Sequence, residues 1–250
     1  MKKYLSIIAF LILLSLWQLV TYLFNIADYL LPSPLRVIIA LKEMALSGAL
    51  IKHCVDSLFR VTWGFYLALF TAIPLGLLLG RKRLFRNLLN PIIQFLRPIS
   101  PLAWIPMALM WFGIGDFPAI FLIFLASFFP LVVFTMSAVM AIKPIYFKVA
   151  KNFGLSGIKL YLKVILPAAL PEIIVGIRVT LGTAWLVIVA AEMIAVKSGL
   201  GYLIIDARNS LRMDRVIAGM IVIGFVGITL DNLIRRLEKM PSVEWSRMRQ

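Results

Sequence analysis

Residues 146–171 read YFKVAKNFGLSGIKLYLKVILPAALP. The stretch is basic and amphipathic, and it lies between two long apolar runs. Its first part carries an apolar face, made by Tyr146, Val149, Ala150 and Phe153. Such a face can dock into a groove on a partner, and Gly154 directly after it permits a turn. The pattern therefore predicts a short helical element held outside a membrane.

The end of this stretch is rich in proline. We expect Pro167 and Pro171 to break the helix that reaches Leu166, because proline cannot continue a helix. A membrane-surface helix whose lysines contact anionic lipid is the alternative interpretation of the whole stretch. Lipid binding alone would not need Ala150, Gly154 and Pro167 at their observed spacings, so we favour a protein partner.

The composition indicates a membrane protein. The 250 residues are 62% hydrophobic and have a mean hydropathy of +0.98, whereas soluble domains are about 45–50% apolar. The net charge is +15, but the charges punctuate apolar runs, which is typical of basic cytoplasmic loops rather than of a nucleic-acid surface. Single Cys54 and His53 residues exclude an internal disulfide and cysteine or multi-histidine metal clusters. We expect both to lie at a loop or span edge without chemistry.

Apolar runs predict an all-α polytopic protein with about six membrane-spanning helices, each needing about 20 residues. The runs are 4–24, 61–80, 92–112, 117–141, 173–196 and 216–234. None alternates as a membrane barrel strand would. The first run could be a signal peptide after Lys2-Lys3, but it is long and no A-x-A site follows, so we expect a retained helix.

The charge distribution predicts the orientation. Six spans place both termini on one side, and with the termini inside, 16 of the 26 lysines and arginines are cytoplasmic and 8 are external. This bias favours cytoplasmic termini and a cytoplasmic 146–171 stretch. Outside, LPSP at 31–34 is expected to start an interfacial helix over 35–50. No domain boundary interrupts residues 1–250, which we interpret as one transmembrane domain.

Several motifs resemble permeases of ABC importers. Their cytoplasmic coupling loop has an E-A-A pattern followed by a glycine and I-x-L-P. Lys148 stands here at the glutamate position and Val149 at the first alanine. The positions that fit are Ala150, Gly154, Val164, Leu166 and Pro167. LPSP, RPISPLAWIPMALMWFGIG (97–115) and AAEMIAVKSGLGYLIIDARN (190–209) are similar to permeases of nitrate, sulfonate, taurine and bicarbonate importers.

The resemblance implies a type I ABC-importer permease fold with a cytoplasmic coupling loop at 143–171. The implied ATPase contacts are Val149, Ala150, Phe153, Gly154, Leu166 and Pro167. It further implies a second permease copy, two cytoplasmic ABC ATPases, an external solute-binding protein and surrounding lipid in a bacterial inner membrane. The chain would carry no cofactor, and ATP and Mg²⁺ would bind the ATPases. The implied solute is a small anion of the aliphatic sulfonate, taurine or nitrate class; the alternative is a thiamine-precursor pyrimidine or a riboflavin-like solute.

Charged and aromatic residues inside predicted spans are candidates for a translocation path. A charge in a bilayer is costly and marks function by default. For Arg178 two roles stay open, an anion pathway or an interhelical salt bridge. Glu192 is expected to make a structural or gate-hinge contact, and Trp104 to face lipid or a cavity. Gly199 and Gly201 are expected in an outer gate loop or a simple turn.

An enzyme is the least expected class. GIGD at 113–116 matches the G-x-G-D string of intramembrane aspartyl proteases, but Asp116 and Asp231 fall near opposite ends of spans. No Walker A string is present, so ATP hydrolysis is not expected on this chain. A secondary transporter usually has more spans and internal repeats, and it would leave the 143–171 loop unexplained.

Overall fold

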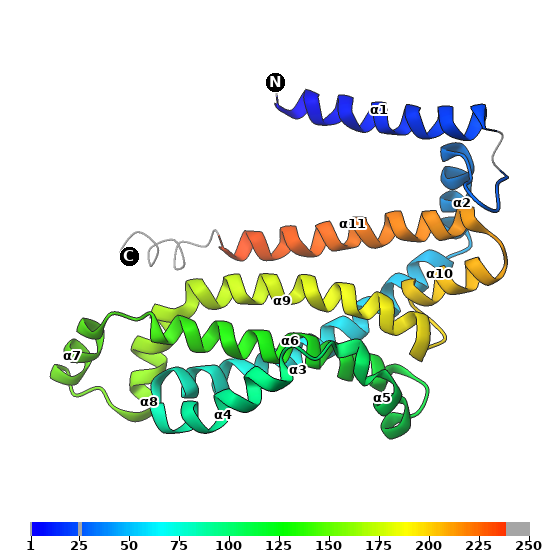
Figure 1. The fold of residues 1–250 in the computed structure, drawn as a ribbon. Helices are drawn as coiled ribbons and strands as arrows, with labels where there is room; N and C mark the ends of the chain where they lie inside the picture. The colour runs from blue at the N-terminus through cyan, green and yellow to red at the C-terminus, as the bar shows by residue number, and fades with distance from the viewer. Residues whose placement is uncertain (1, 25–26, 239–250) are drawn as a thin grey trace.

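The computed structural model describes residues 2–24 and 27–238, and every regular element within them is helical (Figure 1). The α-helices are α1 (Lys2–Leu23), α2 (Pro34–Leu46), α3 (Ala49–Arg81), α4 (Arg83–Leu96), α5 (Ile105–Phe112), α6 (Asp116–Met140), α7 (Pro144–Asn152), α8 (Gly157–Leu160), α9 (Leu166–Ala195), α10 (Leu200–Asn209) and α11 (Met213–Glu238). A 3₁₀ turn at Pro101–Trp104 precedes α5, and a π-helical turn at Tyr161–Ile165 precedes α9.

Four helical stretches of the described chain are long and apolar enough to span a membrane: Ala49–Arg81, Asp116–Met140, Gly157–Ala195 and Met213–Arg236. They correspond to the second, fourth, fifth and sixth predicted spans. The apolar part of α1, Leu11–Leu23, is shorter. The prediction of an all-helical polytopic chain is thus confirmed. The described residues contain four such helices, or five if a bent helix pair is one span, whereas six spans were expected.

The third predicted span, 92–112, was expected to be interrupted by Pro101 and Pro106, and it is sharply bent at Pro101. Its place is taken by α4 and the Pro101–Phe112 helix, which meet at an angle of 84°. Ser100, just before Pro101, has an extended ψ of 130°. A residue before proline is driven away from helical backbone angles, which explains the break. The bent pair is therefore either one broken span or a re-entrant loop.

The prediction that Pro167 and Pro171 break a helix is wrong. Helix continues from Gly157 to Ala195 across both prolines. Pro167 is the second residue of α9 and follows the π-helical turn at Tyr161–Ile165. The π-helical turn directly before it changes the hydrogen-bond ladder at the point where the proline ring would otherwise clash.

Helices α3 and α6 pack along a row of small residues that sequence analysis did not single out. The row repeats every fourth residue, at Gly64, Ala68, Ala72, Gly76 and Gly80. A Cβ atom added at Gly76 would lie 2.5 Å from Cβ of Thr135, and one at Gly80 would lie 2.5 Å from Cβ of Val139. Small residues allow two backbones to approach this closely in a membrane, so α3 and α6 form a tight pair.

The long helices connect two ends of the molecule (Figure 1). One end, the α7 end, holds α4, α7, α8 and the start of α9; the other, the α10 end, holds α2, α5 and α10. The guanidinium carbon of Arg81 lies 4.7 Å from the ring centre of Phe147, which fixes the α3–α4 junction beside α7. Helix α2 confirms the helix expected over 35–50. Residues 49–60, expected outside the second span, instead form the first turns of α3.

Candidate functional site

The predicted coupling segment forms a short helix that ends in a defined stop. The N–H of Leu155 donates to the carbonyl of Ala150 at 2.9 Å, and the N–H of Gly154 donates to that of Lys151 at 3.0 Å. Gly154 has a φ of +67°. These bonds and the left-handed glycine are the Schellman motif, in which glycine avoids the Cβ clash of other residues. Gly154 therefore directs the chain away from α7, as the predicted turn required.

An apolar hollow of about 820 Å³ lies between the end of α6, α7 and the start of α9. We call it the α7 hollow. It is lined by Ala138, Ala141, Ile142, Lys143, Ile145, Tyr146, Val149, Ala150, Phe153, Leu155, Lys163, Val164, Pro167, Ala168 and Glu172. Ala150 is buried there, whereas the Phe153 side chain is 79% exposed. The hollow is thus open, and an exposed aromatic ring lies at its rim.

The six predicted coupling residues fall into two groups. Val149, Ala150, Phe153 and Pro167 line the hollow. Leu166 instead packs against a cluster of buried residues that includes Ala169 and Ile173 of α9. Gly154 shapes the helix end and lies outside the lining.

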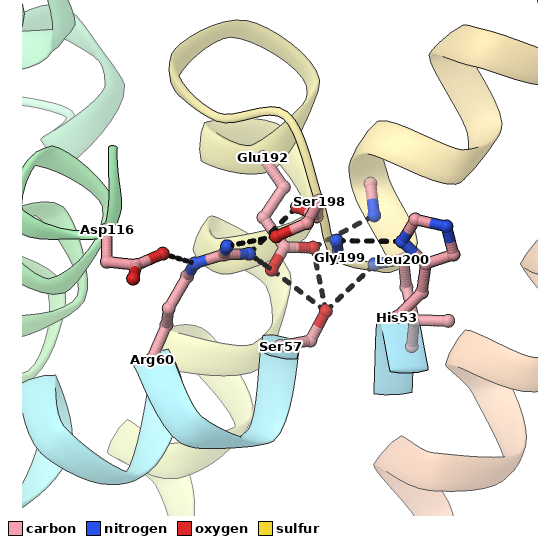
Figure 2. Close-up of polar contacts among 9 residues, drawn as sticks. His53, Ser57, Arg60, Asp116, Glu192, Ser198, Gly199 and Leu200 are labelled. Carbon is pink, nitrogen blue, oxygen red and sulfur yellow. Dashed lines mark hydrogen bonds and ion pairs between the residues drawn. The ribbon is translucent and has the colours of Figure 1, made fainter. Parts of the chain in front are cut away.

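At the opposite end of α9, the carboxylate of Glu192 is completely buried (Figure 2). Ser57 Oγ lies 2.8 Å from each carboxylate oxygen, Arg60 Nη1 donates at 2.7 Å, and the N–H of Gly201 donates at 2.9 Å. A buried charge is tolerated when it is paired and hydrogen-bonded in this way. The structural role expected for Glu192 agrees with this geometry.

Arg60 is the centre of this group and joins three helices. Its side chain is 4% exposed. Nε donates to Asp116 Oδ1 at 2.7 Å, at the start of α6, and Nη1 also donates to the carbonyl of Ser198 at 2.8 Å. Asp116 is 50% exposed. We name Ser57, Arg60, Asp116, Glu192 and Ser198 the Arg60 cluster.

The first N–H groups of α10 are capped by side chains from distant parts of the chain (Figure 2). Gly199 N donates to His53 Nδ1 at 3.0 Å, and Leu200 N donates to Ser57 Oγ at 2.9 Å. A helix start leaves such groups without partners of its own, so these contacts hold α10 onto α3. Gly199 has a φ of +103°, and a Cβ at Gly201 would collide with the carbonyl of Val189. The predicted gate loop is therefore tightly packed in this state.

Arg178 and Trp104 lie away from the Arg60 cluster. Arg178 on α9 binds Asp231 on α11, with Nε to Oδ1 at 2.7 Å and Nη2 to Oδ2 at 3.0 Å. This bidentate pair is the interhelical alternative raised by the sequence. Trp104 is half-buried against the main core, beside residues such as Ala108. A path role for either residue stays a prediction.

Sequence reasoning missed Ser57 and Arg60 as site residues. It placed Ser198 only in the outer loop with Gly199 and Gly201, and it took Asp116 for part of an outer turn. The predicted second span began at residue 61, which left Arg60 just outside it. The available signal was Glu192, an isolated carboxylate in an apolar run that needed a cation from elsewhere in the chain. His53, expected to lie at a span edge without chemistry, is a hydrogen-bond acceptor for the gate loop.

Residues 72–241 match the family model described as binding-protein-dependent transport system inner membrane component. The chain belongs to this family. It is 45% identical to a putative ABC transporter permease of Methanocaldococcus jannaschii, over 77% of this chain and 72% of that protein. It is 36% identical to the putative aliphatic sulfonates transport permease SsuC of Bacillus subtilis, over 91% and 83%. The taurine transport permease TauC of Escherichia coli is also 36% identical, over 94% and 87%.

A solved structure shares the fold. It is entitled an inward-facing conformation of the MetNI methionine ABC transporter, with a TM-score of 0.58 and 18% identity over 72% of this chain and 92% of that one. The family and fold together make this chain a multi-pass membrane permease component of an ABC importer. Such a component is not an enzyme and carries no cofactor, because ATP acts through a partner ATPase.

Proposed function

We propose that this permease imports a small oxyanion of the sulfonate, taurine or nitrate class, and that the 143–171 loop binds a cytoplasmic ATPase through the α7 hollow. The observation that carries the docking proposal is the α7 hollow, with its exposed Phe153. Relatives named for sulfonates, taurine and, at 37% identity, nitrate support the solute class. An uptake assay that compares these anions with a pyrimidine and with riboflavin tests it.

We also propose a homodimer with both termini in the cytoplasm. One chain of this size is too small to enclose a path and bind two ATPases, so a second copy would complete the path. The α7 end carries Arg81 and the lysines of the 143–171 loop, and basic loops favour the cytoplasmic side. In this orientation the Arg60 cluster and the predicted gate loop of Gly199 and Gly201 lie at the outer face.

Arg178 and Trp104 remain our candidates for the translocation path. A guanidinium matches the planar or tetrahedral oxygens of an oxyanion. The Arg178 side chain is 27% exposed, although it is paired with Asp231. An anion that replaced the Asp231 carboxylate for a moment would use the same donors.

The docking proposal is tested by two matched variants. Phe153→Ala removes an exposed ring that lines the hollow, and Ile158→Ala removes an equally exposed apolar side chain of α8 that does not. We expect Phe153→Ala to reduce co-purification of the native ATPase and Ile158→Ala to leave it unchanged, with normal membrane insertion of both. Equal binding by both variants and the wild type would refute docking at this hollow.

A further inference from the structure

Helix α4 has two exposed faces of different character. The first face is apolar, and its side chains are at least half exposed: Leu84, Leu88, Ile92 and Phe95. The second face is polar and mostly exposed, and it consists of Arg83, Asn87, Asn90, Gln94 and Arg97. Each set recurs every three or four residues, which is the spacing of one side of a helix. The two sets therefore lie on two separate sides of α4.

Helix α4 lies beside the spanning helices rather than on a membrane surface. Its third face carries Ile93, which is buried in a cluster with Ala72 of α3 and Leu131 of α6. These two partners lie well inside helices that are long enough to span a membrane. Figure 1 shows α4 running back from the end of α3 alongside the long helices. At this depth the apolar face can contact lipid, but a polar face needs water or another polar surface.

Arg97 ends the polar face at the point where the helix pair bends. It is the C-cap residue of the 14-residue helix α4, so it lies about 21 Å along the helix from the α7 end. The Arg97 side chain is exposed and makes no ion pair or side-chain hydrogen bond within the described residues. Arg178, the other arginine in a predicted span, is bound by Asp231. Arg97 is therefore the one of these two cations whose donors are available to a ligand.

We propose that the polar face of α4 lines the half of the translocation path nearest the α7 end, and that Arg97 binds the oxyanion there. This inference rests on the proposed function, because it needs an anionic solute and a second copy that completes the path. A guanidinium can donate two parallel hydrogen bonds to a sulfonate or nitrate group. Helix α4 contains no Asp or Glu, so no carboxylate on it would repel the anion. Its amide side chains offer further donors between Arg83 and Arg97.

The first test compares the two exposed faces of α4 at nearly the same depth. Gln94→Cys and Ile92→Cys, each in a Cys54→Ser chain, are reacted with a water-soluble maleimide in proteoliposomes that hold the complex with the native ATPase. We expect Gln94→Cys to react about tenfold faster or more, because the reactive thiolate forms readily only in contact with water. Equal rates would show that the polar face does not border a water-filled path, and would overturn the proposal.

The second test measures uptake of the anion that the parent complex imports. Arg97→Gln should lower the initial rate about tenfold, the effect of losing one charge-assisted contact, and Arg97→Lys should lower it less. Lys82→Gln removes an exposed cation just before α4 and should leave the rate unchanged. Because Arg97 has no partner within the described residues, Arg97→Gln should assemble and unfold like the parent.

Three other outcomes overturn this inference. Loss of complex assembly in Arg97→Gln would show that Arg97 joins the two copies. An effect confined to vesicles that contain anionic lipid would show that it binds a lipid headgroup. Uptake of the anion by Arg97→Gln at the parent rate would refute a role in the path and leave the proposed function standing. If the parent complex imports a pyrimidine or riboflavin and none of the anions, the proposed solute class fails, and this inference fails with it.

Discussion

The α7 hollow and the Arg60 cluster lie at opposite ends of α9, and they differ in what completes them. The hollow is apolar and open, and it leaves Phe153 exposed. The Arg60 cluster is polar and buried, and its carboxylate, hydroxyl, guanidinium and backbone N–H groups satisfy one another. The first region therefore has apolar surface that this chain does not cover, whereas the second is a satisfied polar cluster that holds distant parts of the chain together.

The largest effect should come from removing the cation of the buried cluster. Arg60→Met leaves Glu192 buried without its charge partner, and breaking such a pair costs about 3–5 kcal/mol. We expect a strong loss of thermal stability in detergent. The matched variant Arg36→Met removes an exposed pair and should cost at most about 1 kcal/mol. Equal stability of the two variants would show that the cluster does not hold the α10 end.

The second test concerns the close packing of α3 against α6, the helix pair that lies between the two regions. Gly76→Ala places a Cβ 2.5 Å from Cβ of Thr135, so α3 and α6 must separate. Overpacking of this kind costs about 1–3 kcal/mol. Gly224→Ala meets nothing within 4 Å and should leave the unfolding temperature unchanged or slightly higher. If Gly76→Ala left the unfolding temperature unchanged, α3 and α6 would be able to separate at this position at little cost.

A third change acts on the helix stop beside the hollow. Gly154→Ala forces a side chain into left-handed backbone at φ +67°, at a cost of about 1–2 kcal/mol, although its Cβ would meet nothing within 4 Å. Gly154→Asn tolerates this conformation better. We expect ATPase co-purification to fall more for alanine than for asparagine. The reverse order would show that the Schellman stop does not shape the docking surface.

The smallest effect on stability is expected at the pair between α9 and α11. Arg178 and Asp231 are both partly exposed, so their pair should contribute little to stability. If the pair serves as an interhelical tie, Arg178→Gln and Asp231→Asn should reduce uptake and stability to the same small extent. A strong loss of anion uptake in Arg178→Gln alone would instead support the anion-path alternative.

The sequence predicted the helix and turn of the α7 region because that information is local. The short amphipathic run ends at Gly154, whose left-handed backbone forms the turn. The Arg60 cluster was missed because its members come from α3, α6 and α9, and apolar runs do not show which helices adjoin. The run boundary at residue 61 also hid the charge of Arg60.

Two backbone features could not be predicted from propensity alone. Pro167 was expected to stop a helix. Its effect depends on the π-helical turn before it, because that turn changes the backbone hydrogen bonds of several successive residues. Pro101 indicated an interruption between α4 and α5, but the apolar run across it did not indicate a bend as large as 84°. The row from Gly64 to Gly80 was visible in the sequence and becomes informative once α6 is known to face it.

The most direct test of the docking proposal is the accessibility of Phe153→Cys, in a Cys54→Ser chain, measured in sealed vesicles of known orientation. We predict that a membrane-impermeant maleimide labels it from the cytoplasmic side, and that the bound native ATPase protects it. Asn209→Cys should label from the opposite side, with or without the ATPase. Labelling of Phe153→Cys from outside, or at the same rate with the ATPase bound, would contradict the assignment of the α7 hollow as the ATPase docking site.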